Sequence, residues 1–335
     1  MFSLSSTPYQ ALPGFRRSFQ PGKLTLGLFF PIEAYEGDMP TMRNQVALAL
    51  QAERAGFASL WFRDVPLRDP TFGDVGQIYD PWTYLGYLAG QTRDIALGTA
   101  AIVVPIRHPL HLAKAAASID QLSGGRLLLG VASGDRPVEY PAFNVESHSR
   151  GERFVEHLEV MRKSLSTQFE PIRWSEGELR HADLVPKPSG QSIPLFITGS
   201  SRQTLQWIAR EADGWISYPR ALDKQRDIVR LWHETVREQA GDAFKPFSQS
   251  LFIDLTHDPD TAPAPIHQGF RLGRNALLEM LHTLQSFGVN HVMIQLKYGQ
   301  RPAQEVLDEL AEFIVPQFPA LTRGLQTAPT IVTQR

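Results

Sequence analysis

Small and hydroxyl-bearing residues end several apolar runs, and these points are where chemistry is easiest to place. The stretch Thr198-Gly199-Ser200-Ser201 ends the run 193–198, and Gln203 completes a capping-box pattern with Ser200. Gly199 permits a tight turn, and the free N–H groups of a helix start favour an anion such as phosphate. The same pattern is also found at plain, well-capped helices, so on its own it leaves a structural role open.

Two further stretches share this feature. Gly98-Thr99-Ala100-Ala101 interrupts one apolar run, and Ala132-Ser133-Gly134-Asp135 ends the next. Bulky side chains stop there and bare backbone begins, which predicts that a large ligand lies against the backbone. The alternative is that these strand ends happen to carry small residues, because neither stretch is a GxGxxG dinucleotide motif.

Carboxylates near the ends of apolar runs raise a second possibility. Asp64, Asp135 and Asp254 occupy such positions, and a glycoside hydrolase needs paired carboxylates there. Alternatively, Asp64 and Asp254 pair with an arginine or cap a helix. His108 and His111 lack the carboxylate of a HExxH motif, so we expect no metal site and expect His108 to cap a helix or pack.

The elements that must position these residues form a regular series. Eight short, nearly continuous apolar runs read as parallel strands buried on both faces, at 24–30, 57–62, 95–104, 126–132, 193–198, 213–218, 248–255 and 290–296. Helical patterns fill the gaps between them, as in the i, i+4, i+7, i+11 spacing of Phe154, Leu158, Met161 and Leu165. The series predicts a (β/α)₈ TIM barrel of class α/β, with a doubly wound sheet as the alternative.

One domain is expected to span residues 1–335. Residues 1–22 read as an N-terminal extension, and residues 326–335 as a frayed tail. The longest gap, 135–192, lies between strands four and five and predicts an insertion with a helix and a small hairpin. This insertion and the Gly-, Pro- and Asp-rich loops 65–81 and 258–269 are expected at the C-terminal face, where barrels of this kind do chemistry.

Composition excludes several classes of function. The 335 residues are 42% hydrophobic with a formal charge of −2, which argues against nucleic-acid binding. The absence of cysteine excludes disulfides and thiolate nucleophiles. No apolar run is long enough to span a bilayer, and the first residues lack a signal-peptide core, so we expect a cytoplasmic protein that does not bind membranes.

Several motifs in order resemble the bacterial luciferase-like monooxygenase family over about residues 24–319. They include "ERAGFASLWF", "GTAAIVVPIRHP", "IDQLSGGRLLLGVASGD", "PAFNVESHSRGERFVEHLEVM" and "IPLFITGSS". The resemblance implies a barrel with an insertion that binds reduced FMN without a covalent bond. It also implies an oxygen-dependent reaction on a small organic substrate, a separate flavin reductase as partner, and a homodimer.

The family's cofactor site carries over residue by residue. The resemblance implies a non-prolyl cis peptide between Ala100 and Ala101 beside the flavin ring, with Thr99 nearby. The other implied contacts are Ser133 and Gly134 along the flavin chain, Gly199, Ser200 and Ser201 at the phosphate, and Ser217 and Tyr218 near the ring. Phe29, Phe30, Trp82 and Tyr218 predict an apolar pocket, unless they belong to the core.

This sequence departs from the family at two positions. Luciferases carry a catalytic histidine after strand two, where this chain has Asp64 and Val65, so Asp64 is the candidate for an acid/base or substrate contact. The arginine that often holds phosphate after strand four is replaced by Ser133, with Arg136 three residues later. Three alternatives therefore stay open: a deazaflavin-dependent hydride transfer, a non-catalytic flavin-binding protein and a TIM-barrel hydrolase.

Overall fold

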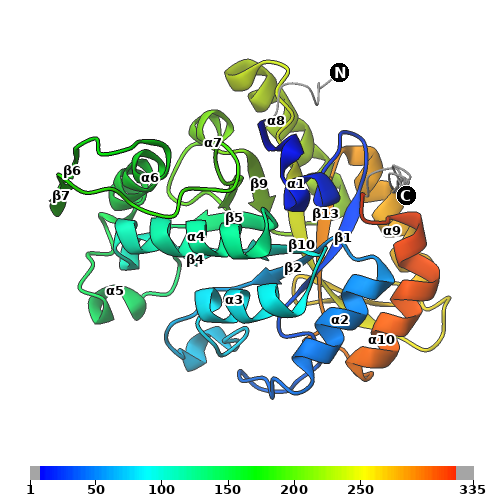
Figure 1. Cartoon of the computed structure of the whole chain (residues 1–335). Helices are drawn as coiled ribbons and strands as arrows, with labels where there is room; N and C mark the ends of the chain where they lie inside the picture. Colours follow the sequence, from blue (N-terminus) through cyan, green and yellow to red (C-terminus); the bar gives the residue numbers. More distant parts are fainter. Residues whose placement is uncertain (1–7, 322–335) are drawn as a thin grey trace, which may run out of the picture.

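Eight parallel strands close into a barrel in the computed structural model, which describes residues 8–321 (Figure 1). Each strand pairs with its neighbours in chain order, and β1 pairs with β13 through Thr25–His291 and the following residues, which closes the ring. This closure confirms the predicted barrel and excludes the open doubly wound sheet. The barrel strands are β1 (Thr25–Phe29), β2 (Ser59–Phe62), β3 (Ala96–Thr99), β5 (Leu127–Ala132), β8 (Leu195–Thr198), β9 (Gly214–Ser217), β10 (Phe247–Leu255) and β13 (His291–Gln295).

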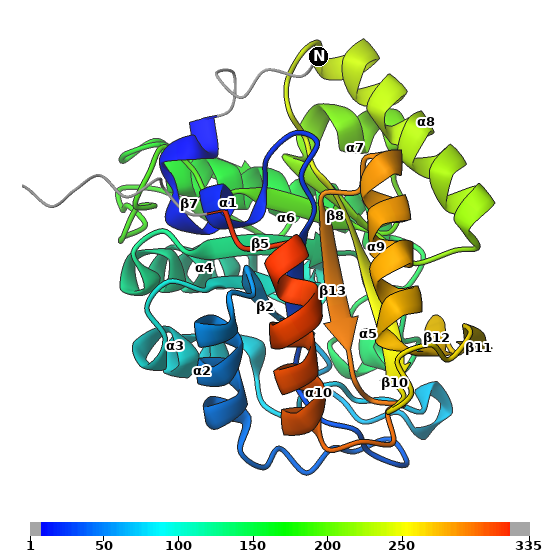
Figure 2. The ribbon, with the colours of Figure 1, turned by 90° about the vertical axis from the view of Figure 1, so that its right-hand side faces the viewer.

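A helix follows every barrel strand, and Figure 2 shows α9 and α10 on the side of the barrel where β13 and β1 meet. A π-helical turn, Leu310–Ile314, and a 3-10 turn, Val315–Gln317, continue α10. The outer helices are α2 (Gln45–Ala55), α3 (Pro81–Gln91), α4 (Pro109–Ser123), α6 (Arg150–Ser166), α7 (Leu205–Glu211), α8 (Leu222–Ala240), α9 (Arg274–Phe287) and α10 (Ala303–Glu309).

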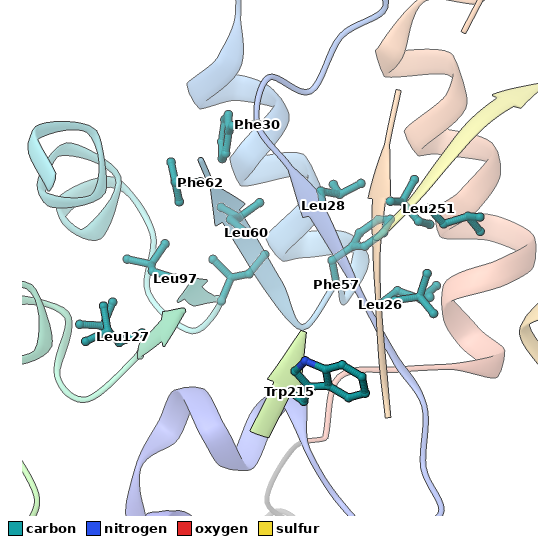
Figure 3. Close-up of a cluster of buried hydrophobic side chains, with 14 of the residues drawn as sticks. Leu26, Leu28, Phe30, Phe57, Leu60, Phe62, Leu97, Leu127, Trp215 and Leu251 are labelled. Atoms are coloured by element: carbon teal, nitrogen blue, oxygen red, sulfur yellow. The ribbon is translucent and has the colours of Figure 1, made fainter. Parts of the chain in front are cut away.

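Alternation along the strands divides the core into two layers. Leu26 and Leu28 of β1 point outward into a large cluster between strands and helices, part of which Figure 3 shows. Trp61, Leu128 and Met293 belong to a second cluster that fills the barrel interior. The side chains of both layers are almost fully buried, so the packed strands give the barrel a rigid frame.

The described part of the expected N-terminal extension closes the barrel at the strands' N-terminal ends. It contains a 3-10 turn, Pro8–Ala11, and α1 (Pro13–Ser18). Phe15 and Phe19 are buried in the interior cluster, and the Phe19 ring lies 5.2 Å from that of Phe196. With this end filled, the opposite, C-terminal end of the barrel is left for a site.

The region between strands four and five has the expected helix and hairpin. A short helix, α5 (Glu139–Ala142), precedes α6, and the hairpin pairs β6 (Ile172–Trp174) with β7 (Gly177–Leu179). Arg153 at the start of α6 binds Glu176 in the hairpin turn. The expected tail 326–335 lies outside the described residues.

Five short elements modify the loops at the strands' C-terminal ends. β4 (Ile102–Val103) pairs with β5, and a 3-10 turn, Val104–Ile106, follows it. A second 3-10 turn, Pro70–Phe72, lies in the loop after β2. β11 (Ala264–Ile266) and β12 (Gly269–Leu272) form a hairpin whose second strand pairs with β10.

Candidate active site

A cavity of about 760 Å³ opens at the C-terminal ends of the strands. Every barrel strand, or the residues directly after it, contributes to its wall. The cavity brings together the following residues that the sequence placed at a site: Asp64, Ala100, Ala101, Ser133, Gly134, Gly199, Ser200, Ser201, Ser217 and Tyr218. This size and position are typical of a small-molecule or cofactor site in a barrel.

Thr99 is the exception among the expected cofactor contacts, because it does not line the cavity. Its side chain is fully buried, and its Oγ1 donates to the Gly130 carbonyl oxygen at 2.7 Å and accepts from the Gly130 N–H at 2.9 Å. A Cβ on Gly130 would overlap the Thr99 carbonyl oxygen. Thr99 therefore joins β3 to β5 rather than facing a ligand.

The Ala100–Ala101 peptide bond is cis, as the resemblance implied. Both residues are half-buried and line the cavity between the end of β3 and the start of β4. Their methyl groups, together with that of Ala132, leave the backbone of this wall open to a flat ligand.

The turn 199–202 differs from the expected capping box. Helix α7 begins only at Leu205, and Thr204 is its N-cap, accepting from the Trp207 N–H at 3.1 Å. Gly199, Ser201 and Arg202 instead adopt positive φ angles of 60°, 45° and 62°. The turn is therefore an irregular loop that precedes the helix.

This turn presents unpaired donors to the cavity. Within residues 8–321, the N–H groups of Ser200, Ser201 and Arg202 have no acceptor, whereas the Gly199 N–H binds the Ile216 carbonyl oxygen. The Thr198 hydroxyl is buried at the cavity wall and also has no partner there. Neighbouring free N–H groups of this kind form anion-binding concavities. The sequence placed Thr198 at the end of the strand but did not mark it as a phosphate contact.

Three arginines add positive charge to the cavity. Arg136, Arg150 and Arg202 line its wall, and none forms an ion pair within the described residues. Arg150 lies over the Tyr140 ring at 5.3 Å and donates through Nη1 to Ser147. Arg150 and Arg202 were not foreseen, because neither a half-buried arginine at the start of a helix nor an exposed arginine in a loop carries a local signal.

Asp64 is engaged in a buried ion pair. Its side chain is fully buried, and Oδ1 and Oδ2 accept from Arg107 at 2.6 and 2.9 Å, while Oδ2 also accepts from the Val103 N–H at 3.0 Å. A bidentate fork of this kind fixes the carboxylate and the guanidinium in one geometry. The geometry thus favours a positioning role, in which Asp64 holds the segment after the cis peptide.

A second buried carboxylate shapes the wall after β2. Burial alone would raise the pKa of Asp74, but the Arg63 guanidinium at 2.8 Å and the Tyr35 hydroxyl at 2.7 Å lower it to about 2. The ammonium group of Lys297 lies 3.8 Å away. Asp74 is therefore ionised at neutral pH and fixes Arg63 in the cavity wall. Within the expected loop 65–81, no local pattern marked it.

Of the three carboxylates considered for hydrolysis, Asp254 does not line the cavity. Asp254 binds Arg271 at 3.0 Å and accepts from the Gln300 N–H at 3.1 Å. Asp135 does line the cavity, but it is exposed. The wall therefore does not offer the pair of free strand-end carboxylates that the hydrolase alternative required.

The expected aromatic pocket is formed only in part. Phe29 and Tyr218 line the cavity, whereas the Phe30 ring stacks on Phe62 at 4.8 Å in the outer core and Trp82 packs against that core. The wall gains other rings that were not foreseen: Phe72, Phe252, His267 and Tyr298.

His108 caps a helix, as predicted, since its Nδ1 accepts from the Leu110 N–H at the start of α4. Among residues 8–321, no three His, Asp or Glu side chains are grouped to hold a metal ion. In the same part of the chain, no helix is both long and apolar enough to cross a membrane.

Comparison with known proteins identifies the family. The model of the luciferase-like monooxygenases matches residues 24–321, so the chain belongs to this family. An uncharacterised protein of Mycobacterium tuberculosis is 34% identical over 231 residues, covering 64% of this chain and 80% of that protein. The alkanal monooxygenase beta chain of Photorhabdus luminescens is 26% identical over 172 residues, covering 51% of this chain and 53% of that one.

Two solved structures with the same fold contain different cofactors. An F420-dependent secondary alcohol dehydrogenase in complex with an F420–acetone adduct superposes with a TM-score of 0.71 at 18% identity. The Type II Baeyer–Villiger monooxygenase of Pseudomonas putida in complex with FMN superposes with a TM-score of 0.69 at 15% identity. They cover 88% and 89% of this chain and 99% of their own chains. The protein is thus an oxidoreductase of a family whose members use FMN or the deazaflavin F420.

Proposed function

We propose that this protein is a monooxygenase that uses reduced FMN and oxygen to oxidise a small organic substrate. The observation that carries the proposal is the turn 199–202, which lines a cavity of cofactor size and has N–H groups without a partner in the described residues. Such a turn favours a phosphate group. The small-residue wall at Ala100 and Ala101 on the same cavity suits a planar ring.

The donor set fits a phosphorylated flavin. The N–H groups of Ser200, Ser201 and Arg202 would hold the phosphate, and the unpaired Thr198 hydroxyl and the Arg150 guanidinium would complete its shell. Ser133 and Gly134 would follow the chain of the cofactor, and Ser217 and Tyr218 would contact the ring. Bound in this way, the reduced flavin supplies the electrons that activate oxygen.

The protein's own residues orient the reactants and exclude water. Phe29, Ile216 and Phe252 give the cavity apolar walls, which strengthen polar interactions inside it. Asp64 holds Arg107 and the Val103 N–H, and so fixes the backbone that follows Ala101. The catalytic histidine that luciferases carry after strand two is absent here, and the Asp64–Arg107 ion pair occupies that place.

A deazaflavin-dependent hydride transfer is the second candidate. It is supported by the F420-dependent hydroxymycolic acid dehydrogenase of Mycobacterium tuberculosis, which is 28% identical over 211 residues and covers 61% of this chain and 55% of that one. The same turn would bind the deazaflavin's phosphate. Oxygen consumption separates the candidates, because only the monooxygenase uses oxygen during turnover.

Two partners belong to the proposal through family membership. A flavin reductase would supply reduced FMN, and a second copy of the chain would complete a homodimer. Sedimentation at micromolar concentration tests the dimer, and a single species of monomer mass would contradict it. Substrate-dependent NADH consumption beyond that of an added reductase tests the first partnership and separates an enzyme from a flavin-binding protein.

Charge reversal at the turn tests the phosphate site. Ser201→Asp places a negative charge beside the proposed phosphate, and we expect it to weaken FMN affinity at least about tenfold. Ser118→Asp adds the same charge on α4 and serves as the control, with unchanged affinity expected. Equal affinities of the wild type and Ser201→Asp would remove the phosphate from this turn.

A further inference from the structure

Arg136 has a donor aimed at no partner in the cavity wall. The residue is 8% exposed, and its Nη2 donates to the Asp74 carbonyl oxygen at 2.6 Å. Its guanidinium lies over the Phe72 ring at 4.4 Å. These contacts fix the plane of the guanidinium, yet Nη1 is buried and has no hydrogen-bond partner within residues 8–321. A fixed and unsatisfied cationic donor is costly unless a ligand satisfies it.

No carboxylate of the described chain neutralises this charge. No carboxylate oxygen there lies within 4.0 Å of the Arg136 guanidinium. Glu139 and Asp69 are close enough for the Arg136 charge to act on their pKa values, but neither forms an ion pair with it. Burial raises the pKa of Glu139 to about 7, so much of it is protonated at neutral pH. The Asp74 carboxylate is held by Arg63 and Tyr35. A buried cation without a counter-ion favours the binding of an anion.

Arg136 has different neighbours from those of the turn 199–202, although both line the same cavity. It contacts Phe72 and Asp74 in the loop after β2. Arg150 and Arg202 are close enough to Tyr140 to act on its pKa, and the Tyr140 hydroxyl lies 3.5 Å from the Ser133 carbonyl oxygen. Arg136 is therefore held against the loop after β2, whereas Arg150 and Arg202 lie by Tyr140 and the turn 199–202.

We propose that Arg136 binds a carboxylate of the substrate, which makes the substrate a small organic acid. This inference rests on the proposed function, in which the cofactor's phosphate lies at the turn 199–202. The carboxylate would accept from Nη1, while the Asp74 carbonyl oxygen and the Phe72 ring keep the guanidinium in place. Phe72, Phe252 and Tyr298 line the same cavity and give an apolar or aromatic body a surface to pack on.

Benzoate and its neutral analogue benzamide test the proposal by calorimetry on the cofactor-loaded protein. We expect the wild type to bind benzoate at least about tenfold more tightly than benzamide, as for a charge-assisted hydrogen bond in a buried site. Arg136→Gln should abolish this preference, and Arg136→Lys should keep part of it. Arg54→Gln is the matched control, because it removes an exposed positive charge of α2 that does not line the cavity and should keep the preference.

Two results would overturn the proposal. One is equal affinity of the wild type for benzoate and benzamide, which needs no variant to fold. The other is an Arg136→Gln protein that keeps the preference for benzoate but binds FMN at least tenfold more weakly, since Arg136 would then serve the cofactor's phosphate. If the wild type binds neither FMN nor the deazaflavin, the proposed function fails. The benzoate comparison on cofactor-free protein then tests Arg136 separately.

Discussion

Removing Arg107 from the Asp64–Arg107 ion pair should destabilise the protein more than removing the charge of Asp64. Arg107→Met leaves a fully buried carboxylate without its partner, whereas Asp64→Asn leaves an arginine that is about a quarter exposed. Arg107 Nη2 also lies 3.6 Å from an oxygen of Asp80, which gives it a second partner. We therefore expect the arginine substitution to be the more damaging of the two.

Removing one partner of a buried ion pair costs about 3–5 kcal/mol. The Asp64 side chain is fully buried, so we expect Arg107→Met to lower the free energy of unfolding by about 3–4 kcal/mol. In Asp64→Asn, solvent screening and the Asp80 carboxylate reduce the cost of leaving Arg107 without its partner carboxylate. The side-chain oxygen of the new amide can also still accept from the Val103 N–H. We therefore expect about 2 kcal/mol for Asp64→Asn.

Urea unfolding followed by circular dichroism measures both variants, and turnover is measured on the same samples below the unfolding transition. The positioning role predicts that turnover falls in both variants, because both lose the Asp64–Arg107 ion pair that fixes the segment after Ala101. An Asp64→Asn protein as stable as the wild type but inactive, beside an active Arg107→Met protein, would refute this reasoning. Asp64 would then be the acid/base group that its place in the sequence first indicated.

Three other substitutions give separate tests. Thr99→Val removes both hydrogen bonds to Gly130 and should lower the free energy of unfolding by about 1–3 kcal/mol without changing FMN affinity; a large affinity loss would return Thr99 to the site. Ala101→Leu should weaken FMN binding strongly while thermal stability stays near the wild type, and unchanged affinity would remove the ring from this wall. Burial keeps His291 neutral and lowers its pKa to about 3, so the unfolded chain binds its proton first and stability falls as pH drops from 6.5 towards 3. His291→Gln should flatten that fall by up to about 1.4 kcal/mol per pH unit in pH-dependent urea midpoints, and an unchanged slope would contradict it.

The sequence predicted the barrel well because strands buried on both faces are nearly continuous runs of apolar residues. All eight apolar runs became barrel strands, and the helix and hairpin after strand four were also foreseen. The start of α7 was wrong by several residues, because Ser200 and Gln203 imitate a cap while Thr204 provides the real one. Local patterns do not say which of two nearby polar residues the chain will use.

The site was predicted less completely than the fold. Small residues at strand ends were found because backbone exposure leaves a composition signal, and these residues do line one cavity. Thr99 was misplaced because its hydroxyl binds Gly130 on a neighbouring strand, a partner that is distant in sequence. The pairing of Asp64 with Arg107 and the isolation of Arg136 likewise depend on which loops meet in space.

The affinity of the wild type for FMN compared with riboflavin tests the central claim most directly. The two ligands carry the same ring system and differ by the phosphate, which we assign to the turn 199–202. Fluorescence titration should give at least about tenfold tighter binding of FMN, and Ser201→Asp should remove most of that advantage. Equal affinities for FMN and riboflavin in the wild type would contradict the claim that this turn holds a cofactor phosphate.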